Sequence, residues 1–389
     1  MKTSSKPNIF EVGRNTKPAM PSQVEIDALT TLFQQGRVAE LEKQILRMTQ
    51  QYPQHGVAWK FMGVLLRMQG KLAESLKPMQ TACKLLPYDH EAFNNLGSTL
   101  EALKEPKFAE ACYQRAIQVK PDYADGLLNL AHLLLHNGRP QEAAPLFERR
   151  LALTPDDDYV RHLVMSLRGQ QSERATPGYV AKIFDNQADN FEAHWVEGLQ
   201  YTVPRQLADL INACGQAPQG PWRVLDLGCG TGLMGVAIAS RASELIGVDL
   251  SPKMLEKARS KGVYQSLLQA DIDTVMKAEA AGSFDLITSA DVFIHIGKID
   301  EIVAEARRLL RTGGLMAFSV ETLELPEADT AQAATEYRLK ASGRYGQSGA
   351  YLARLAEQHG FKALSITDTT LRTEVDKPVP GQLVIWQAI

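Results

Sequence analysis

The sequence lacks any run of about 18 consecutive apolar residues, which is the length that a helix needs to cross a bilayer. Its first residues include Lys and Arg but no apolar segment, so they do not follow the pattern of a secretory signal. Cysteine is scarce, and the cysteines form neither a CxxC pair nor a spacing with His that indicates a zinc site. We therefore expect a cytoplasmic protein without a metal site, whose residues 1–21 form a flexible tail. The cysteines are Cys83, Cys112, Cys214 and Cys229.

A strong excess of charge of one sign is also absent. The chain has 42 Lys and Arg against 45 Asp and Glu, a formal net charge of −3, and neither half is strongly basic. Because a basic surface is the usual electrostatic signature of nucleic-acid binding, we expect no nucleic-acid partner. With 389 residues, 44% of them hydrophobic, the chain is long enough for two ordinary soluble domains.

Prolines recur every 34 residues through the first half of the chain, at Pro53, Pro87, Pro121 and Pro155. Counted from these prolines, small residues mostly fall where two antiparallel helices would cross, and large apolar residues fall where units would pack. Proline itself ends a helix because it has no N–H to donate. The period and register resemble the tetratricopeptide repeat. The resemblance implies an all-α solenoid over residues 22–170, made of four repeats and a capping helix.

The concave face of such a solenoid commonly holds an extended peptide or a partner protein, and the resemblance implies this role here. The alternative is an array that only packs against the second domain or mediates self-association. The sequence leaves both interpretations open.

The pattern changes after a polar stretch at 171–180, which we interpret as a linker. A helical segment at 179–211 then leads into strands that alternate with helices, the pattern of a parallel sheet covered on both faces. Residues 181–389 are therefore expected to form an α/β domain. The expected strands are 222–228, 244–250, 265–270, 284–290, 315–321, 363–371 and 382–387, with helices at 231–241, 251–260 and 301–311.

A glycine-rich loop follows the first expected strand, in the run VLDLGCGTG over residues 224–232. Glycine allows a tight turn and lets a ligand lie against bare backbone. Asp249 ends the next expected strand, where its carboxylate can accept hydrogen bonds from ribose hydroxyls. A nicotinamide dinucleotide needs the spacing GxGxxG, whereas this loop has GxGxG, and Asp226 before it would repel a pyrophosphate. The same carboxylate suits the cationic amino group of a methionine moiety, so the pattern favours S-adenosylmethionine over NAD.

The successive motifs resemble those of class I S-adenosylmethionine-dependent methyltransferases in order and spacing. These motifs are VLDLGCGTG, GVDLSPKML, the step from Ala270 to Ile272, FDLITSADVFIHI and LLRTGGLMAFSVE. The resemblance implies a Rossmann-like domain with a seven-stranded, mostly parallel sheet. The whole chain resembles the bacterial proteins described as predicted methyltransferases with tetratricopeptide repeats.

The same resemblance assigns the cofactor contacts. It implies that Asp226 and the glycine loop hold the methionine part, that Asp249 holds the ribose, and that Asp271 accepts a hydrogen bond from the exocyclic amine of adenine. The cofactor-binding residues implied are Asp226, Gly228, Cys229, Gly230, Thr231, Gly232, Asp249, Leu250, Asp271, Ile272 and Ala290.

Candidates for acceptor binding follow the fourth and fifth expected strands. His295 has a side chain whose ordinary pKa suits a general base, although it can equally be a hydrogen-bonded pocket wall. Asp291 stands at the same edge, where substrates enter. Arg338, Arg344 and Tyr345 lie in an insertion, where the two arginines either clamp an anionic substrate or are simply solvated.

Together these patterns predict methyl transfer to an O, N or S nucleophile of a small molecule or a protein. No Asn-Pro-Pro-Tyr motif follows the fourth strand and no Pro-Cys nucleophile is present, which argues against the methylation of DNA bases. The alternatives are a non-catalytic repeat scaffold that keeps the cofactor-binding fold, and a dehydrogenase, which the GxGxG spacing disfavours.

Overall fold

A computed structural model describes residues 20–215, 218–323, 336–374 and 377–389. The contacts divide the chain into two units, Met1–Leu153 and Thr154–Ile389. Residues 1–19 of the expected tail lie outside the described residues. Among the helices that the structure describes, none is long and apolar enough to cross a membrane.

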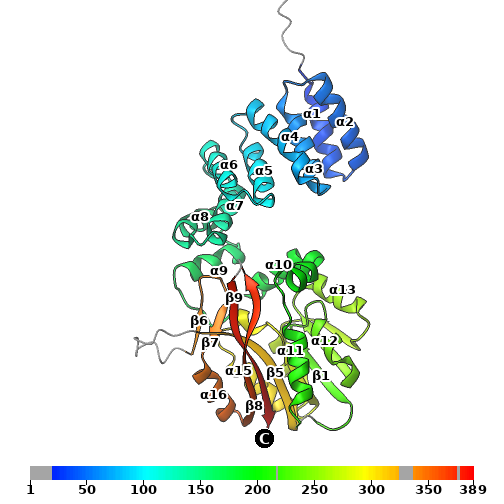
Figure 1. Ribbon diagram of the computed structural model, residues 1–389, viewed down its shortest axis with the longest axis vertical. Helices are drawn as coiled ribbons and strands as arrows, with labels where there is room; N and C mark the ends of the chain where they lie inside the picture. Colours follow the sequence, from blue (N-terminus) through cyan, green and yellow to red (C-terminus); the bar gives the residue numbers. More distant parts are fainter. Residues whose placement is uncertain (1–19, 216–217, 324–335, 375–376) are drawn as a thin grey trace, which may run out of the picture. The chain divides into compact units, whose positions relative to one another are not determined.

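The first unit is built from helical hairpins (Figure 1). The second helices of the hairpins begin at Val38, Leu72, Pro106 and Pro140, which keeps the 34-residue interval of the prolines. The described helices of this unit are α1 (Gln23–Gln34), α2 (Val38–Gln51), α3 (Gly56–Met68), α4 (Leu72–Leu85), α5 (His90–Ala102), α6 (Pro106–Val119), α7 (Ala124–His136) and α8 (Pro140–Leu153).

Close helix crossings explain the small residues of the repeat. A Cβ added to Gly97 in α5 would lie 2.6 Å from the Tyr113 ring in α6, and one added to Gly63 in α3 would lie 2.6 Å from Met79 in α4. These contacts pair the small position of each repeat with its large apolar position, as the register predicts. The all-α solenoid is therefore confirmed.

The second unit contains a mixed sheet of nine strands in the described residues. Strands β3-β2-β1-β4-β5 are parallel neighbours, and β9 pairs antiparallel with both β5 and β8. The strands are β1 (Trp222–Leu227), β2 (Ala242–Asp249), β3 (Ser266–Gln269), β4 (Phe284–Ser289), β5 (Leu310–Thr322), β6 (Tyr337–Leu339), β7 (Tyr345–Gln347), β8 (Phe361–Glu374) and β9 (Lys377–Ala388).

The α/β sheet is confirmed, but the expected count of seven strands is too low. The two additional strands are β6 and β7, which form a hairpin beside the end of β5 through pairing of Thr322 with Gln347. Each spans three residues, which is too short to produce a period-2 pattern that the sequence alone would reveal.

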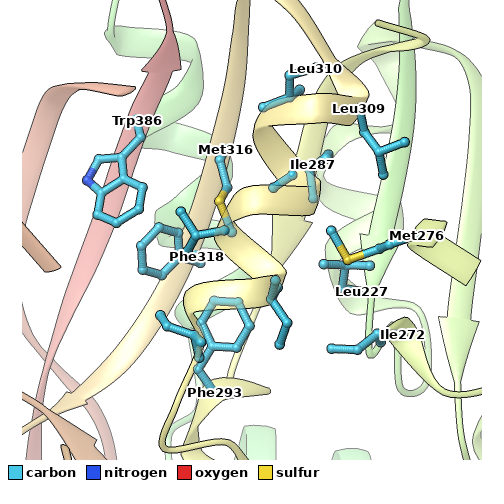
Figure 2. Packing of buried hydrophobic residues seen from close by; sticks show 14 of the residues in the cluster. Leu227, Ile272, Met276, Ile287, Phe293, Leu309, Leu310, Met316, Phe318 and Trp386 are labelled. Atoms are coloured by element: carbon cyan, nitrogen blue, oxygen red, sulfur yellow. The ribbon is translucent and has the colours of Figure 1, made fainter. Parts of the chain in front are cut away.

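Both faces of the sheet are covered by helices. Along β1 the side chains alternate, so that Leu225 and Leu227 join one buried cluster while Val224 joins the other. Figure 2 shows part of the first cluster, including Met316, Phe318 and Trp386. The helices of this unit are α9 (Asp158–Leu167), α10 (Pro177–Gln187), α11 (Val203–Ala213), α12 (Leu233–Ile238), α13 (Pro252–Ser260), α14 (Ile272–Ala278), α15 (Asp300–Leu309) and α16 (Gly349–Gln358).

The segment between the last repeat and α10 differs from its sequence interpretation. Helix α9, which the sequence assigns to the repeats as a cap, groups with the second unit, and its His162 Nε2 lies 2.8 Å from the Gly343 carbonyl oxygen. The expected linker 171–180 is bound to the sheet unit, because Gly297 N–H donates to the Glu173 carbonyl at 2.9 Å. Polar residues here make long-range hydrogen bonds, and α10 already begins at Pro177.

Candidate active site

A pocket opens beside the carboxyl ends of β1, β2 and β4, where open parallel sheets bind their ligands. It brings together most of the residues that the sequence singled out, although Gly232 is not part of its lining. The expected residues that line it are Asp226, Gly228, Cys229, Gly230, Thr231, Asp249, Leu250, Asp271, Ile272, Ala290, Asp291 and His295.

The glycine loop turns tightly between β1 and α12. Gly228, Gly230 and Gly232 all have positive φ, at 64°, 53° and 89°, which other residues rarely adopt. A Cβ on Gly228 would meet Val292 at 2.4 Å, whereas one on Gly230 would meet no atom within 4 Å. Bare backbone therefore faces open space at Gly230, on the wall of the pocket.

Asp249 ties the end of β2 to the glycine loop. Its Oδ2 accepts the Gly230 N–H at 2.9 Å, and its Oδ1 accepts the Ser251 N–H at 2.8 Å. Burial raises the pKa of the carboxyl, and these backbone donors oppose the rise. A carboxylate has about four lone-pair sites, so Asp249 can still accept a hydrogen bond from a ligand hydroxyl.

Asp226 lies at the bottom of the pocket and is almost fully buried. Its carboxylate accepts hydrogen bonds from the Tyr264 hydroxyl at 2.6 Å and from Thr288 Oγ1 at 2.8 Å. Burial raises the pKa of Asp226 to about 6, with the two hydroxyls lowering it and the Asp249 charge raising it further. The group is therefore an anion at neutral pH and becomes neutral in mild acid.

Asp271 forms the third acidic part of the pocket. Its Oδ1 accepts the Asp273 N–H at 3.0 Å, which caps α14, and its Oδ2 accepts a hydrogen bond from Arg174 at 2.9 Å. Arg174 also forms an ion pair with Asp273. Sequence reasoning missed Arg174, since it belongs to a polar stretch interpreted as a linker.

His295 is 7% exposed, and its Nδ1 has no hydrogen-bond partner among the described residues. Its ring packs edge-on against Phe184, with centroids 5.4 Å apart. Burial, together with the positive charge of Arg344, lowers the pKa of His295 to about 3. The imidazole is therefore uncharged at neutral pH; its ring is part of the pocket lining, and its Nδ1 atom is buried.

Asp291 follows β4 in a left-handed backbone conformation, with φ of 58°. Its N–H donates to Ser319 Oγ at 2.8 Å, and the Ser319 hydroxyl donates back to its Oδ1 at 2.9 Å. Its Oδ2 accepts a hydrogen bond from Arg372 Nη1 at 3.1 Å. Burial raises the pKa of this carboxyl, and the Arg372 charge opposes the rise.

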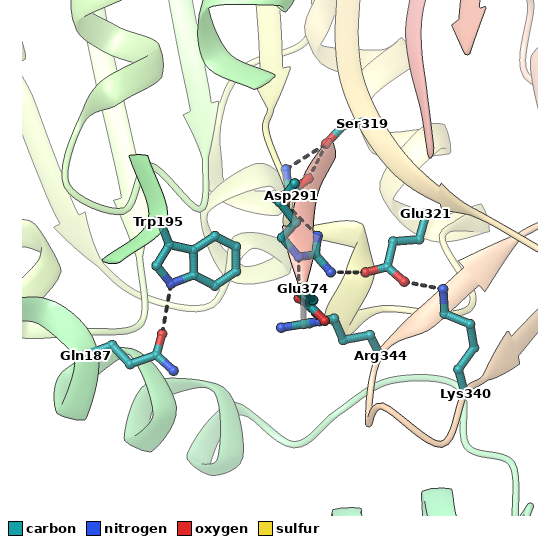
Figure 3. Close-up of polar contacts among 9 residues, drawn as sticks. Gln187, Trp195, Asp291, Ser319, Glu321, Lys340, Arg344 and Glu374 are labelled. Atoms are coloured by element: carbon teal, nitrogen blue, oxygen red, sulfur yellow. Dashed lines mark hydrogen bonds and ion pairs between the residues drawn. The ribbon is translucent and has the colours of Figure 1, made fainter. Parts of the chain in front are cut away.

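Arg372 is the centre of an ionic network that includes Asp291; Figure 3 shows the members Asp291, Glu321 and Glu374. Its guanidinium, which is fully buried, binds three carboxylates, and these in turn bind two further cations. The ion pairs are Arg372 with Asp291, Glu321 and Glu374, Lys340 with Glu321, and Arg344 with Glu374.

The other expected acceptor residues lie outside the lining of the pocket. Arg344 is engaged by Glu374, and Arg338 lies in β6. Tyr345 is fully buried in β7, with its hydroxyl 2.5 Å from Ser172 Oγ. The structure therefore does not bring these residues together with Asp291 and His295 around the pocket.

Aromatic residues that precede β1 form a wall of the pocket. Phe191 stacks on Trp195 with ring centroids 5.2 Å apart, and Trp195 meets Tyr201 edge-on at 5.6 Å. Figure 3 shows the Trp195 indole N–H donating to Gln187, at 3.2 Å. Trp195 lies in a π-helical turn over Ala193–Gly198, a rare form that occurs often at functional sites.

Known proteins resemble both units of the chain. A family model described as a methyltransferase domain matches residues 225–318, and tetratricopeptide repeat models match residues 90–123 and 112–144. A ubiquinone biosynthesis O-methyltransferase from Thiobacillus denitrificans is 32% identical over 165 residues, covering 40% of this chain and 71% of that protein. The chain belongs to the S-adenosylmethionine-dependent methyltransferases.

Two further proteins are similar to this methyltransferase. A malonyl-[acyl-carrier protein] O-methyltransferase from Pseudescherichia vulneris is 32% identical over 164 residues, covering 42% of this chain and 62% of its own length. The crystal structure of an S-adenosylmethionine-dependent methyltransferase from Mesorhizobium loti is 23% identical, with a TM-score of 0.37, and covers 46% of this chain and 97% of its own. The family assignment rests on the sequence relatives.

The pocket of this methyltransferase fits S-adenosylmethionine, the cofactor of the family. Asp226 supplies a buried negative charge that suits the cationic amino group, and Asp249 keeps free lone pairs for hydroxyls. The Thr231 hydroxyl is buried in the same loop without a partner among the described residues. The dehydrogenase alternative is therefore set aside, because a pyrophosphate would meet the Asp226 carboxylate.

Proposed function

We propose that this protein transfers a methyl group from S-adenosylmethionine to a hydroxyl oxygen of a small molecule. The observation that carries the proposal is the uncharged His295 imidazole in the lining of a pocket with an aromatic wall. The similarity to proteins named as O-methyltransferases supports oxygen as the acceptor atom. Nitrogen and sulfur acceptors are the alternatives that the test below separates.

The cofactor contacts divide along the carboxyl edge of the sheet. Asp226 and the loop from Gly228 to Gly232 would hold the methionine part, and Asp249 the ribose hydroxyls. Asp271 and Ile272 would hold the adenine. The Asp271 carboxylate already accepts two hydrogen bonds, so it would receive the adenine amine on a remaining lone pair.

When bound, S-adenosylmethionine supplies an electrophilic methyl group whose bond to sulfur breaks with its electron pair left on sulfur. The remaining task of this chain is to orient the acceptor oxygen, exclude water and receive one proton. The aromatic wall of Phe191, Trp195 and Tyr201 excludes water from the acceptor side. In this proposal the His295 imidazole accepts the hydrogen bond of the acceptor hydroxyl, and the proton released as the C–O bond forms passes through the ring to solvent.

The lowered pKa of His295 limits how strong a base it is. We therefore assign it mainly to orienting the hydroxyl, with proton transfer occurring late, once the acceptor oxygen has given its electron pair to the methyl carbon. This assignment joins the two roles that the sequence left open for His295, a hydrogen-bonding wall and a proton acceptor.

The repeats have a different role in this proposal. We propose that the first unit binds a protein partner through its solenoid surface, as the repeat family implies. The non-catalytic scaffold is not supported, because the loop and acidic residues of the cofactor site are all present.

The acceptor atom is tested with a matched series. Full-length protein receives S-adenosylmethionine labelled in its methyl group together with 4-ethylphenol, 4-ethylaniline or 4-ethylthiophenol. We expect enzyme-dependent label in the methyl ether of 4-ethylphenol and none above background in the other two. Preferential labelling of the amine or the thiol would contradict an oxygen acceptor, and label on protein alone would contradict a small-molecule substrate.

A further inference from the structure

Aromatic residues line the side of the pocket that would receive the methyl acceptor. The inference drawn from them rests on the proposed function. The wall of the pocket includes the rings of Phe191, Trp195 and Tyr201, all of them buried. Tyr201 is fully enclosed, and burial with the nearby Asp291 charge raises the pKa of its hydroxyl well above the ordinary value. Tyr201 is therefore a neutral hydrogen-bond donor beside apolar rings.

The charges that line the pocket are nearly all negative. Asp226, Asp249, Asp271 and Asp291 are the acids of the lining. Among the described lining residues Arg174 is the one cation, and it is bound to two carboxylates. No unpaired positive charge among these residues faces the interior, so an anionic ligand would lose its hydration without gaining a cationic partner.

The cations that pack near these aromatic residues are also paired with carboxylates. Three of them, Arg372, Arg344 and Lys340, pair with three carboxylates, so the network has no formal excess charge. Arg372 lies over the Trp195 ring, with 5.6 Å between its guanidinium carbon and the ring centroid. Arg344 also lies over this ring and is bound by Glu374, and Arg372 is bound by Asp291, which itself lines the pocket.

We propose that the acceptor is a planar aromatic molecule that carries a hydroxyl group and no negative charge, held against Trp195 and Tyr201. Arg372 and Asp291 are the positioning pair that sets this selectivity. Arg372 fixes the Asp291 carboxylate and supports the Trp195 ring, and Asp291 cancels the positive charge that an anion would otherwise find.

The test uses full-length protein saturated with S-adenosylhomocysteine and follows binding by calorimetry. The probes are 4-ethylphenol, which is uncharged, tyramine, which is cationic, and 4-hydroxyphenylacetate, which is anionic. They share a phenol ring and a short chain and differ in charge. We expect 4-ethylphenol and tyramine to bind, and 4-hydroxyphenylacetate to bind at least tenfold more weakly than 4-ethylphenol.

Variants then test whether the pairing of charges in the Arg372 network sets the preference against anionic ligands. Asp291→Asn leaves Arg372 with one carboxylate fewer, so the tenfold penalty against the anion should shrink to threefold or less. Asp368→Asn removes an exposed carboxylate from the same strand as Arg372 and should keep the full penalty. If Asp291→Asn does not fold, Glu374→Gln tests the same balance through a partly exposed member of the network.

The outcomes separate this inference from the function on which it rests. Binding of 4-hydroxyphenylacetate as tight as that of 4-ethylphenol would overturn the inference, as would no binding of any probe to protein that binds S-adenosylhomocysteine. If Asp291→Asn and Glu374→Gln both fold and still bind the anion tenfold more weakly than 4-ethylphenol, the ionic network does not set the selectivity. Failure to bind S-adenosylhomocysteine itself would contradict the cofactor site and the proposed function together.

Discussion

Arg174 lies against Asp271, with Nη2 2.9 Å from Oδ2, although the two residues are 97 positions apart in the chain. The contact joins the segment before α10 to the wall of the pocket that would hold adenine. The same segment pairs with the loop after β4, since Ala175 N–H donates to the His295 carbonyl at 2.9 Å. This short stretch is therefore part of the candidate active site.

Arg174→Gln should weaken cofactor binding more than it weakens the fold. Its ion pairs with Asp271 and Asp273 are partly exposed, so their loss should cost the fold about 1 kcal/mol or less. Without Arg174 the two carboxylates repel each other, which shifts the part of the pocket that would hold adenine. We therefore expect calorimetry to show several-fold weaker binding of S-adenosylhomocysteine. Lys298→Gln is the matched control, because it breaks the more exposed ion pair with Glu173 in the same segment. Equal effects of the two changes would contradict a role for Arg174 at the site.

Asp249→Asn should lower the affinity for S-adenosylhomocysteine by about tenfold or more. A charged acceptor for ribose hydroxyls is worth on the order of 1.5–3 kcal/mol. The amide can still accept one of the two backbone hydrogen bonds, so circular dichroism should show an intact fold. Glu256→Gln, which removes an exposed carboxylate from the neighbouring helix α13, should leave the affinity unchanged. An unaltered dissociation constant in folded Asp249→Asn would refute the ribose contact.

Cofactor affinity should depend on pH through Asp226, whose pKa is raised by burial to about 6. A cationic amino group binds the ionised carboxylate, so affinity should be constant from about pH 7 to 8 and should fall as the pH drops through 6. Well below that value, proton linkage limits the loss to about tenfold per pH unit. Titrations of S-adenosylhomocysteine between pH 5 and 8 measure the slope. Asp226→Asn should bind weakly with no such slope, and a variant that retains the slope would assign it to another group.

His295→Phe should reduce turnover while leaving the cofactor site in place. The change keeps a ring against Phe184 and removes both nitrogens, so the affinity for S-adenosylhomocysteine should stay within about twofold. We expect kcat for methylation of 4-ethylphenol to fall by about tenfold or more, the scale of an oriented proton acceptor. A wild-type kcat in this variant would make His295 a pocket wall only.

A fragment that begins at Thr154 should fold and bind S-adenosylhomocysteine like the full chain, because the contacts place α9 with the second unit. A fragment that begins at Ser172 lacks the buried residues Val160 and Leu163 of α9. Its Tm should therefore be lower by about 2–8 °C in a thermal melt, the shift expected for a loss of one to two kcal/mol in a unit of this size. Equal Tm values for the two fragments would support a domain boundary at residue 171, where the sequence places it.

The sequence is informative where the signal is local or periodic. The repeats follow from prolines in a fixed register, and the cofactor loop from glycines between a strand and a helix, where Gly228 needs both its φ and the absence of a Cβ. These signals depend on residues close together in the chain, so one sequence suffices to predict them.

The parts that the sequence missed depend on contacts between distant segments. Arg372 lies in β8 and binds Asp291, which follows β4, and no spacing in the chain relates the two. Tyr264 reaches Asp226 from the turn before β3. The sequence leaves Arg344 either as a clamp for a substrate anion or as a solvated residue, whereas the fold gives it Glu374 as a partner. A charge's partner is a property of the folded packing, which composition and periodicity do not encode.

The central claim is methyl transfer from S-adenosylmethionine to a hydroxyl oxygen of a small molecule. Its most direct test supplies the full-length protein with S-adenosylmethionine labelled in the methyl group and with a cell extract separated into protein and small-molecule fractions. The account predicts enzyme-dependent label in the small-molecule fraction, on a product whose mass spectrum places the methyl group on oxygen. Label confined to the protein fraction, or placed on nitrogen or sulfur, would contradict it.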